Sequence, residues 1–112
     1  MNTSEMFSYE RAQRVLDYSA DASFGALSRD WLQASMQRKY VYNFDWMGRP
    51  IIQYPQDMVA MQELVWQVRP DLIIETGIAH GGSLILSASL LAMLDMCDAI
   101  EAGTTLDPRQ SS

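Results

Sequence analysis

The residues best suited to chemistry lie in one short segment, Ile74 to Ser83, which reads Ile-Glu-Thr-Gly-Ile-Ala-His-Gly-Gly-Ser. A carboxylate comes just before the first glycine, and a histidine, two adjacent glycines and a serine follow. Gly77 permits a tight turn. The paired glycines Gly81 and Gly82 let backbone N–H groups face a ligand and let the following helix start close to the strand. The pattern Glu-x-Gly-x-x-x-Gly-Gly therefore predicts a ligand-binding turn between a strand and a helix.

The spacing and charge of this segment favour one class of ligand. Dinucleotide sites place glycines at Gly-x-Gly-x-x-Gly against a pyrophosphate, and this segment has a different spacing. Glu75 would be unfavourable beside a diphosphate, but it is acceptable beside the amino group or the sulfonium-bearing methionine part of S-adenosylmethionine. We therefore expect S-adenosylmethionine as the ligand. A purely structural glycine turn and a fragment of a nicotinamide-dependent oxidoreductase are the alternatives.

Ala79, His80 and Ser83 have different expected roles. Ala79 keeps the turn narrow where a nucleoside approaches, and Ser83 can cap the next helix or donate its hydroxyl. His80 is either a loop residue that contacts ligand or solvent, or a general base near a methyl acceptor. It is the only histidine and has no identifiable partner in the sequence, so we favour the first interpretation and leave the catalytic residues unassigned.

Three elements must position this turn. A helix is expected to start at Pro55, with Asp57 favourably placed in its first turn, and to end before Pro70. Residues 71–75 form a short apolar run rich in β-branched residues, which predicts a buried strand of a parallel sheet. Residues 83–98 are apolar nearly all round, as in a helix buried against a sheet. The order helix, strand, loop, helix is typical of the opening of a doubly wound α/β fold.

The first third of the chain is predicted to be helical. Residues 9–18 contain no proline or glycine, and Val15 and Leu16 are candidates for the buried side of a helix. Gly25 is expected to break the helix, and Ser28 to cap a second one. We therefore expect a helical segment over residues 1–39, followed by the start of an α/β domain over residues 40–112.

Aromatic residues crowd the segment from Tyr40 to Gln53, and Met47-Gly48-Arg49-Pro50 is a turn signal. We interpret this segment as a loop or short extended piece whose rings cover an edge of the domain. The alternative is one wall of a ligand pocket. The last residues, 101–112, are polar and rich in turn formers, so we expect a flexible tail.

Composition excludes some classes of function. The formal net charge is −6, and such an acidic chain repels the phosphate backbone, so a sequence-independent nucleic-acid binder is not expected. The one cysteine, Cys97, allows neither an internal disulfide nor a cysteine-based metal site, and we expect it to be a small core residue.

The cysteine count fits a reducing compartment, and the N-terminus lacks the pattern of a signal peptide. The most apolar stretch, residues 84–96, is short and interrupted by polar residues, so no membrane span is expected. We expect a cytoplasmic location.

Three motifs in order give the chain a family resemblance. They are the segment Trp46-Met-Gly-Arg-Pro-Ile-Ile-Gln-Tyr-Pro-Gln-Asp57, the triplet Gln62-Glu-Leu64, and the segment Arg69-Pro-Asp-Leu-Ile-Ile-Glu-Thr-Gly-Ile-Ala-His-Gly-Gly-Ser83. Together they resemble the cephalosporin hydroxylase / rhamnosyl O-methyltransferase family over about Tyr40 to Leu94.

The resemblance implies a Rossmann-like class I methyltransferase fold, S-adenosylmethionine as cofactor, and methyl transfer to a hydroxyl of a sugar or small metabolite. It implies a cofactor site lined by Glu75, Gly77, Ala79, His80, Gly81 and Ser83, to which we add Gly82. Gln53 and Asp57 match the upstream part of the family pattern, where helix capping and loop bracing are their simplest roles.

The chain departs from the family after the glycine turn. The second strand, whose acidic end would hold the ribose, is missing, and so are the later acidic residues that would bind a divalent metal. The resemblance therefore implies a truncated N-terminal part with little activity alone. Since one strand cannot form a sheet, we expect a marginally stable chain that self-associates or pairs with a separately encoded C-terminal half. A non-catalytic interaction module is the alternative function.

Overall fold

The computed structural model describes residues 1–110, which belong to two compact units, Met1–Arg38 and Lys39–Ser112. The expected flexible tail is only partly described. Glu101 and Ala102 belong to a helix, Pro108–Gln110 form a short 3-10 helix, and residues 111–112 lie outside the described part of the chain.

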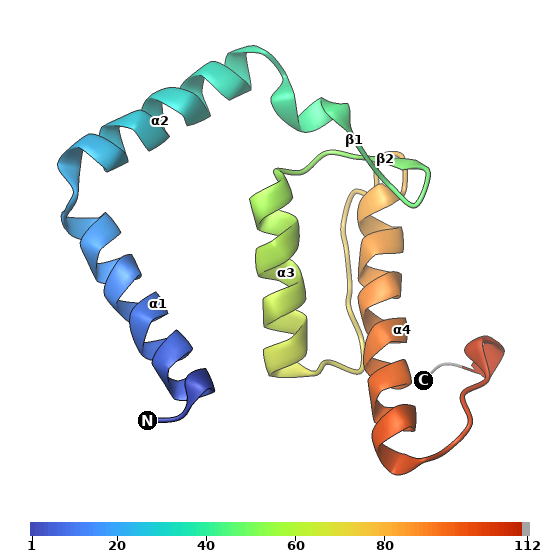
Figure 1. Cartoon of the computed structure of the whole chain (residues 1–112). Helices are drawn as coiled ribbons and strands as arrows, with labels where there is room; N and C mark the ends of the chain where they lie inside the picture. Colours follow the sequence, from blue (N-terminus) through green and yellow to red (C-terminus); the bar gives the residue numbers. More distant parts are fainter. Residues whose placement is uncertain (111–112) are drawn as a thin grey trace. The chain divides into compact units, whose positions relative to one another are not determined.

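The first unit is a pair of helices, α1 (Thr3–Ala20) and α2 (Ala22–Gln37), joined at Asp21 (Figure 1). Asn2 and Glu5 form a capping box at the start of α1. The Asn2 side chain accepts a hydrogen bond from the Glu5 N–H at 2.9 Å, and the Glu5 carboxylate accepts one from the Asn2 N–H at 3.0 Å. Asp21 caps α2 by accepting a hydrogen bond from the Phe24 N–H at 3.0 Å.

Two expectations for this unit are wrong. The break falls at Asp21 rather than at Gly25, and α2 runs through Gly25 and Ser28. An aspartate that satisfies free N–H groups is a stronger helix boundary than one glycine, which lowers helix stability by only about 1 kcal/mol. Val15 and Leu16 are exposed, because α1 buries none of its residues.

The second unit opens with a β-hairpin where a loop or short extended segment was expected. After a 3-10 helix at Tyr40–Asn43, the strands β1 (Phe44–Trp46) and β2 (Arg49–Ile51) pair antiparallel, with Trp46 opposite Arg49. The predicted turn is confirmed. Met47 and Gly48 both have positive φ, as two-residue hairpin turns require.

Two helices follow, α3 (Pro55–Val68) and α4 (Gly82–Ala102). The bounds predicted for α3 are confirmed, since Pro55 is its first residue and Pro70 lies just past its end. The second helix extends beyond the predicted residues 83–98 and stops at Gly103, which has a φ of +65°. Figure 1 shows α3 and α4 side by side, with an extended segment running back between them.

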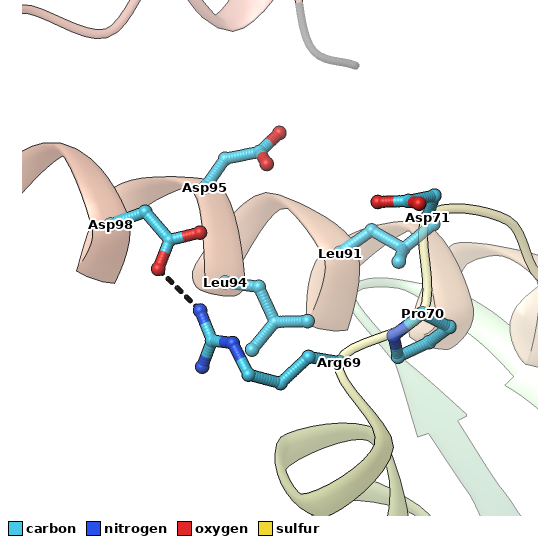
Figure 2. A pocket seen from close by; sticks show the side chains of 7 residues that line it. All are labelled: Arg69, Pro70, Asp71, Leu91, Leu94, Asp95 and Asp98. Carbon is cyan, nitrogen blue, oxygen red and sulfur yellow. Dashed lines mark hydrogen bonds and ion pairs between the residues drawn. The ribbon is translucent and has the colours of Figure 1, made fainter.

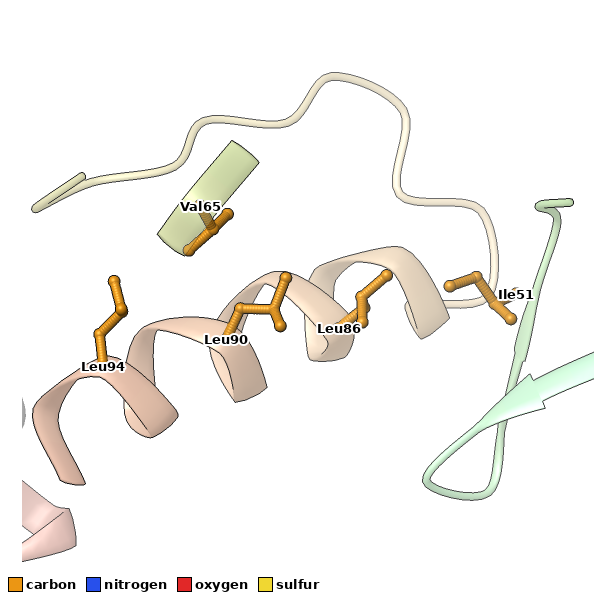
Figure 3. Close-up of a cluster of buried hydrophobic side chains, with 5 residues drawn as sticks. All are labelled: Ile51, Val65, Leu86, Leu90 and Leu94. Atoms are coloured by element: carbon orange, nitrogen blue, oxygen red, sulfur yellow. The ribbon is translucent and has the colours of Figure 1, made fainter. Parts of the chain in front are cut away.

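The core lies where α3 and the hairpin meet α4. Its buried members are Ile51, Val65, Leu86, Leu90 and Leu94. Figure 3 shows the three leucines in a row along α4, as a spacing of four residues dictates, with Val65 facing the row and Ile51 closing its end. Two apolar residues of α3, Leu64 and Val68, are exposed, and Cys97, which was expected to be a core residue, is half-buried.

The predicted strand at residues 71–75 is extended but unpaired. The only sheet among residues 1–110 is the β1–β2 hairpin. Ile73 packs on the core, whereas Leu72 and Ile74 are 71% and 80% exposed. The expectation of burial on both faces is therefore wrong. The run has the alternation of a strand, but within the described residues it finds no second strand to complete its backbone hydrogen bonds. The unit is a mixed α/β structure dominated by helices.

By length and composition alone, α4 could cross a membrane. The apolar stretch noted in the sequence, residues 84–96, is too short to do so. The same test is passed by core helices of proteins that never enter a membrane. Here α4 contributes three of the five core side chains, so its apolar character has a structural use within the unit.

Candidate functional site

The carboxylate of Glu75 is held in place by two serines of α4. One of its oxygens, Oε1, accepts a hydrogen bond from Ser83 Oγ at 2.6 Å and another from Ser87 Oγ at 3.1 Å. Ser83 and Ser87 are one helical turn apart, so both hydroxyls leave the same face of α4 and reach the same acceptor. These bonds tie the end of the extended run to the first turns of the helix.

The second carboxylate oxygen, Glu75 Oε2, is buried and has no hydrogen-bond partner within residues 1–110. A buried polar atom without a partner loses the free energy of its hydration, and a charged one loses more. Such an atom is uncommon in folded proteins, where an ordered water, an ion or a ligand usually supplies the partner. The missing partner must be a donor, and a cationic N–H group satisfies a carboxylate best.

Glu75 lines a cavity of about 380 Å³, within the range of small-molecule sites. Its lining comes from two stretches of chain, one around the end of β2 and one around the glycine turn. The lining residues are Pro50, Ile51, Ile52, Gln53, Glu75, Thr76, Gly77, Ile78, Ala79 and Ser83. The cavity thus combines apolar side chains with polar groups that can orient a ligand.

The glycine turn contains backbone conformations that residues with side chains rarely adopt. Gly77 and Gly81 have φ of +75° and +88°, and Ala79 adopts a φ of +45° despite its side chain. The turn closes with a hydrogen bond from the Gly81 N–H to the Ile78 carbonyl at 2.7 Å. The predicted turn into a helix is therefore present, but it follows an unpaired extended run rather than a paired strand.

Gly82 begins α4 and allows the helix to start against the hairpin. A Cβ at this position would overlap the Pro50 carbonyl oxygen and would lie 2.8 Å from Ile51 Cβ. A close approach to the run at residues 71–75 was expected for this glycine. The close contact is with β2 instead, and it brings the second wall of the cavity to the glycine turn.

The structure separates the predicted site residues into two groups. Glu75, Gly77, Ala79 and Ser83 line the cavity, whereas His80, Gly81 and Gly82 do not. His80 is exposed on the outside of the turn. The two adjacent glycines instead determine how the turn enters α4.

Ser87, Gln53 and Thr76 are polar residues of the site that the sequence motif did not assign. Ser87 is buried, and its position four residues after Ser83 on an apolar helix was a usable signal. Gln53 was noted in the sequence but given no role. Its place in the cavity depends on the hairpin, which the sequence did not predict.

A second, smaller cavity of about 180 Å³ lies at the other end of α3 and is more polar. Figure 2 shows Arg69 reaching from the end of α3 to an ion pair with Asp98 on α4, with Asp95 and Asp71 nearby. Arg69 also stacks over the Trp66 ring, 5.1 Å from its centroid. The ion pair is largely exposed, and such pairs contribute little stability. We interpret this region as a brace between the two helices.

No group of three or more side chains able to hold a metal ion occurs among residues 1–110. The candidate site comprises one carboxylate, two serine hydroxyls, a glycine turn and a cavity lining of mixed polar and apolar residues.

Comparison with protein families identifies the chain. A family described as rhamnosyl O-methyltransferase/CmcI matches residues 38–109. The match covers the hairpin, both helices of the second unit and the whole candidate site, and the chain belongs to this methyltransferase family. Comparison with curated proteins and with solved structures gave no match.

Proposed function

We propose that residues 39–110 hold the amino-acid end of S-adenosylmethionine in an O-methyltransferase, as the N-terminal part of a Rossmann-like class I fold. The single observation that carries the proposal is the buried, unpartnered Oε2 of Glu75, a residue that lines the cavity beside the glycine turn. Membership of a methyltransferase family supports it independently, since S-adenosylmethionine is the usual methyl donor of methyltransferases.

The charge and geometry of the site fit this ligand. The ammonium of an amino acid offers the cationic N–H groups that Glu75 Oε2 lacks, and Ser83 and Ser87 keep the carboxylate turned towards it. Gly77 and Ala79 bring the backbone to the cavity without bulky side chains. When bound, S-adenosylmethionine supplies an electrophilic methyl group.

The acceptor in this proposal is a hydroxyl of a sugar or small metabolite, and the location is cytoplasmic. The described residues would bind and orient the donor, and alignment of donor and acceptor would provide most of the rate enhancement. We assign no general base. His80 is exposed and lies outside the cavity lining, so the structure adds nothing in favour of that role.

Titration calorimetry with S-adenosylmethionine tests the proposal. We expect the unchanged chain to bind, and Glu75→Gln to weaken binding about tenfold or more because the charge facing the ammonium is lost. Glu63→Gln removes the same charge from the exposed face of α3 and should leave the affinity unchanged. Gly81→Val should also weaken binding, since valine resists a φ of +88°. Equal affinities for Glu75→Gln and the unchanged chain would contradict the proposal.

A second candidate function, an interaction module, is favoured by the exposed apolar side of the run at residues 71–75. Leu72 and Ile74 project from an extended segment that has no strand partner within the described residues. We propose that this side is covered by a second copy of the chain or by a separately encoded C-terminal half. An unpaired extended segment with apolar side chains is a template for strand addition.

Sedimentation velocity over a range of concentrations separates these possibilities. Self-association predicts a mass that rises with concentration, and Ile74→Lys should abolish the rise without touching the core-facing Ile73. A monomeric mass with a cooperative melt at all concentrations would refute self-association and marginal stability together. Binding of S-adenosylmethionine only after addition of a C-terminal half would support the interaction module.

A further inference from the structure

The cavity has a second wall with one polar side chain, Gln53. The other lining residues on this side are Pro50, Ile51 and Ile52, all apolar. Gln53 is half-buried, and its side chain has no hydrogen bond within residues 1–110. A glutamine amide carries two donors and an acceptor, and neither polar atom of the Gln53 amide is buried without a partner, so the amide is accessible to a ligand. The chain at the end of the hairpin therefore brings an uncommitted amide to the cavity that Glu75 also lines.

The ligand proposed above carries a carboxylate as well as an ammonium, and the carboxylate needs hydrogen-bond donors. Its amino-acid end is a zwitterion, so a site that offers only Glu75 would satisfy the ammonium and repel the carboxylate. No lysine or arginine lines the cavity. Arg49 approaches the glycine turn at Gly81 but is not part of the lining. The carboxylate must therefore be met by neutral donors.

Two side chains of the lining can donate to that carboxylate besides Ser83, whose hydroxyl is already used by Glu75. Thr76 directly follows Glu75 and lies on the same stretch of chain, whereas Gln53 comes from the hairpin. A zwitterion has its charges on separate groups, and contacts from two separate stretches of chain fix its orientation better than contacts from one. This consideration favours Gln53.

We propose that Gln53 is a ligand-binding residue that donates its side-chain amide to the carboxylate of the amino-acid end, while Glu75 accepts from the ammonium. The inference rests on the function proposed above and adds a specificity determinant to it. The site then distinguishes an amino-acid zwitterion from an amine. A nucleoside thioether without the amino-acid end would lose both contacts.

Calorimetry with two ligands tests the assignment, using S-adenosylmethionine and its decarboxylated analogue, which keeps the amine and lacks the carboxylate. Gln53→Ala should weaken binding of S-adenosylmethionine about tenfold and leave the analogue nearly unchanged. Gln53→Glu should weaken S-adenosylmethionine further, because two carboxylates then face each other, and should strengthen binding of the cationic analogue. A merely structural glutamine would not produce opposite changes for the two ligands.

Gln56→Ala is the matched control, since Gln56 is an exposed glutamine of α3 that does not line the cavity. It should alter neither affinity. If the unchanged chain binds S-adenosylmethionine and the Gln53 variants change both affinities equally, or change neither, the role of Gln53 is refuted and the proposed function stands. If the unchanged chain binds neither ligand, the proposed function fails, and this inference fails with it.

Discussion

The two units of the chain are stabilised in different ways. In residues 1–38, α1 buries nothing, and the helix boundaries are set by caps made from residues at most three positions apart. In residues 39–110, five buried side chains from β2, α3 and α4 form a core, and a cavity opens beside it. The first unit is determined by local contacts and the second by contacts between distant segments.

The contrast indicates which unit can hold a functional site. A cavity needs walls that hold their positions, and only the second unit packs elements against each other to provide them. The family match agrees, because it starts at residue 38. Substitutions should therefore act on one unit and spare the other, which can be tested directly.

The largest effect is expected from Leu86→Ala. Leu86 is 2% exposed at the centre of the core, and such truncations lower the free energy of unfolding by about 2–5 kcal/mol. Hydrogen exchange read by mass spectrometry should show loss of protection in α3 and α4 and none in α1 and α2. Leu84→Ala, at a position that is 42% exposed, should have a much smaller effect. Equal loss of protection in both units would contradict the comparison.

A pair of glycine substitutions should change stability in opposite directions. Gly82→Ala forces a Cβ into β2, and overpacking of this kind costs about 1–3 kcal/mol. Gly25→Ala lies within α2, where the added Cβ meets only the end of the Arg29 side chain at 3.4 Å, and it should stabilise the helix by about 1 kcal/mol. Thermal denaturation followed by circular dichroism measures both changes. Stabilisation by Gly82→Ala would show that the helix start is not packed on the hairpin.

Ser87→Ala tests the second unit's site rather than its core. The substitution removes one of the two hydroxyls that hold Glu75, at 3.1 Å, and should weaken binding of S-adenosylmethionine about fivefold. Ser89→Ala is the control on the same helix. It removes the acceptor of the Trp46 Nε1 hydrogen bond, at 3.1 Å, and should leave the affinity unchanged. A larger loss of affinity for Ser89→Ala would refute the role given to Ser87.

The smallest effect is expected from acid on the first unit. The Phe24 backbone N–H, and then the Ser23 hydroxyl, hold the pKa of Asp21 below its usual value. The charged cap therefore stabilises α2 above the unfolded pKa, and this contribution disappears as pH falls through the lower folded pKa, below about pH 4. Asp21→Asn keeps the cap without the titration. Helicity in acid should fall less for this variant, and identical acid profiles would exclude Asp21 as the titrating cap.

The parts of the fold that were predictable depend on neighbouring residues. Pro55 and Pro70 set the bounds of α3 because proline restricts its own backbone and that of the residue before it. The hairpin turn was predictable from Met47-Gly48, but the pairing of the strands was not. The predicted helix break at Gly25 was wrong because one glycine is a weak helix breaker. Asp21, four residues earlier, provides a better cap.

The candidate site was predictable only in part, because only some of its residues are neighbours in the sequence. Glu75 and the glycine turn are contiguous, so their pattern could be interpreted directly. Ser87 is twelve positions from Glu75, and Gln53 lies more than twenty positions before it. The spacing from Ser83 makes Ser87 a candidate, but no local signal pairs either residue with Glu75, because these segments meet only in the folded unit.

The sequence alone determined the helical segments, the hairpin turn, the glycine turn and the family resemblance, since each follows from residue types at short spacing. The tertiary structure decided which face of the run at residues 71–75 is buried, which oxygen of Glu75 lacks a partner, and which residues share its cavity. These depend on packing between segments far apart in the chain, where burial and hydrogen bonding are properties of the assembled unit.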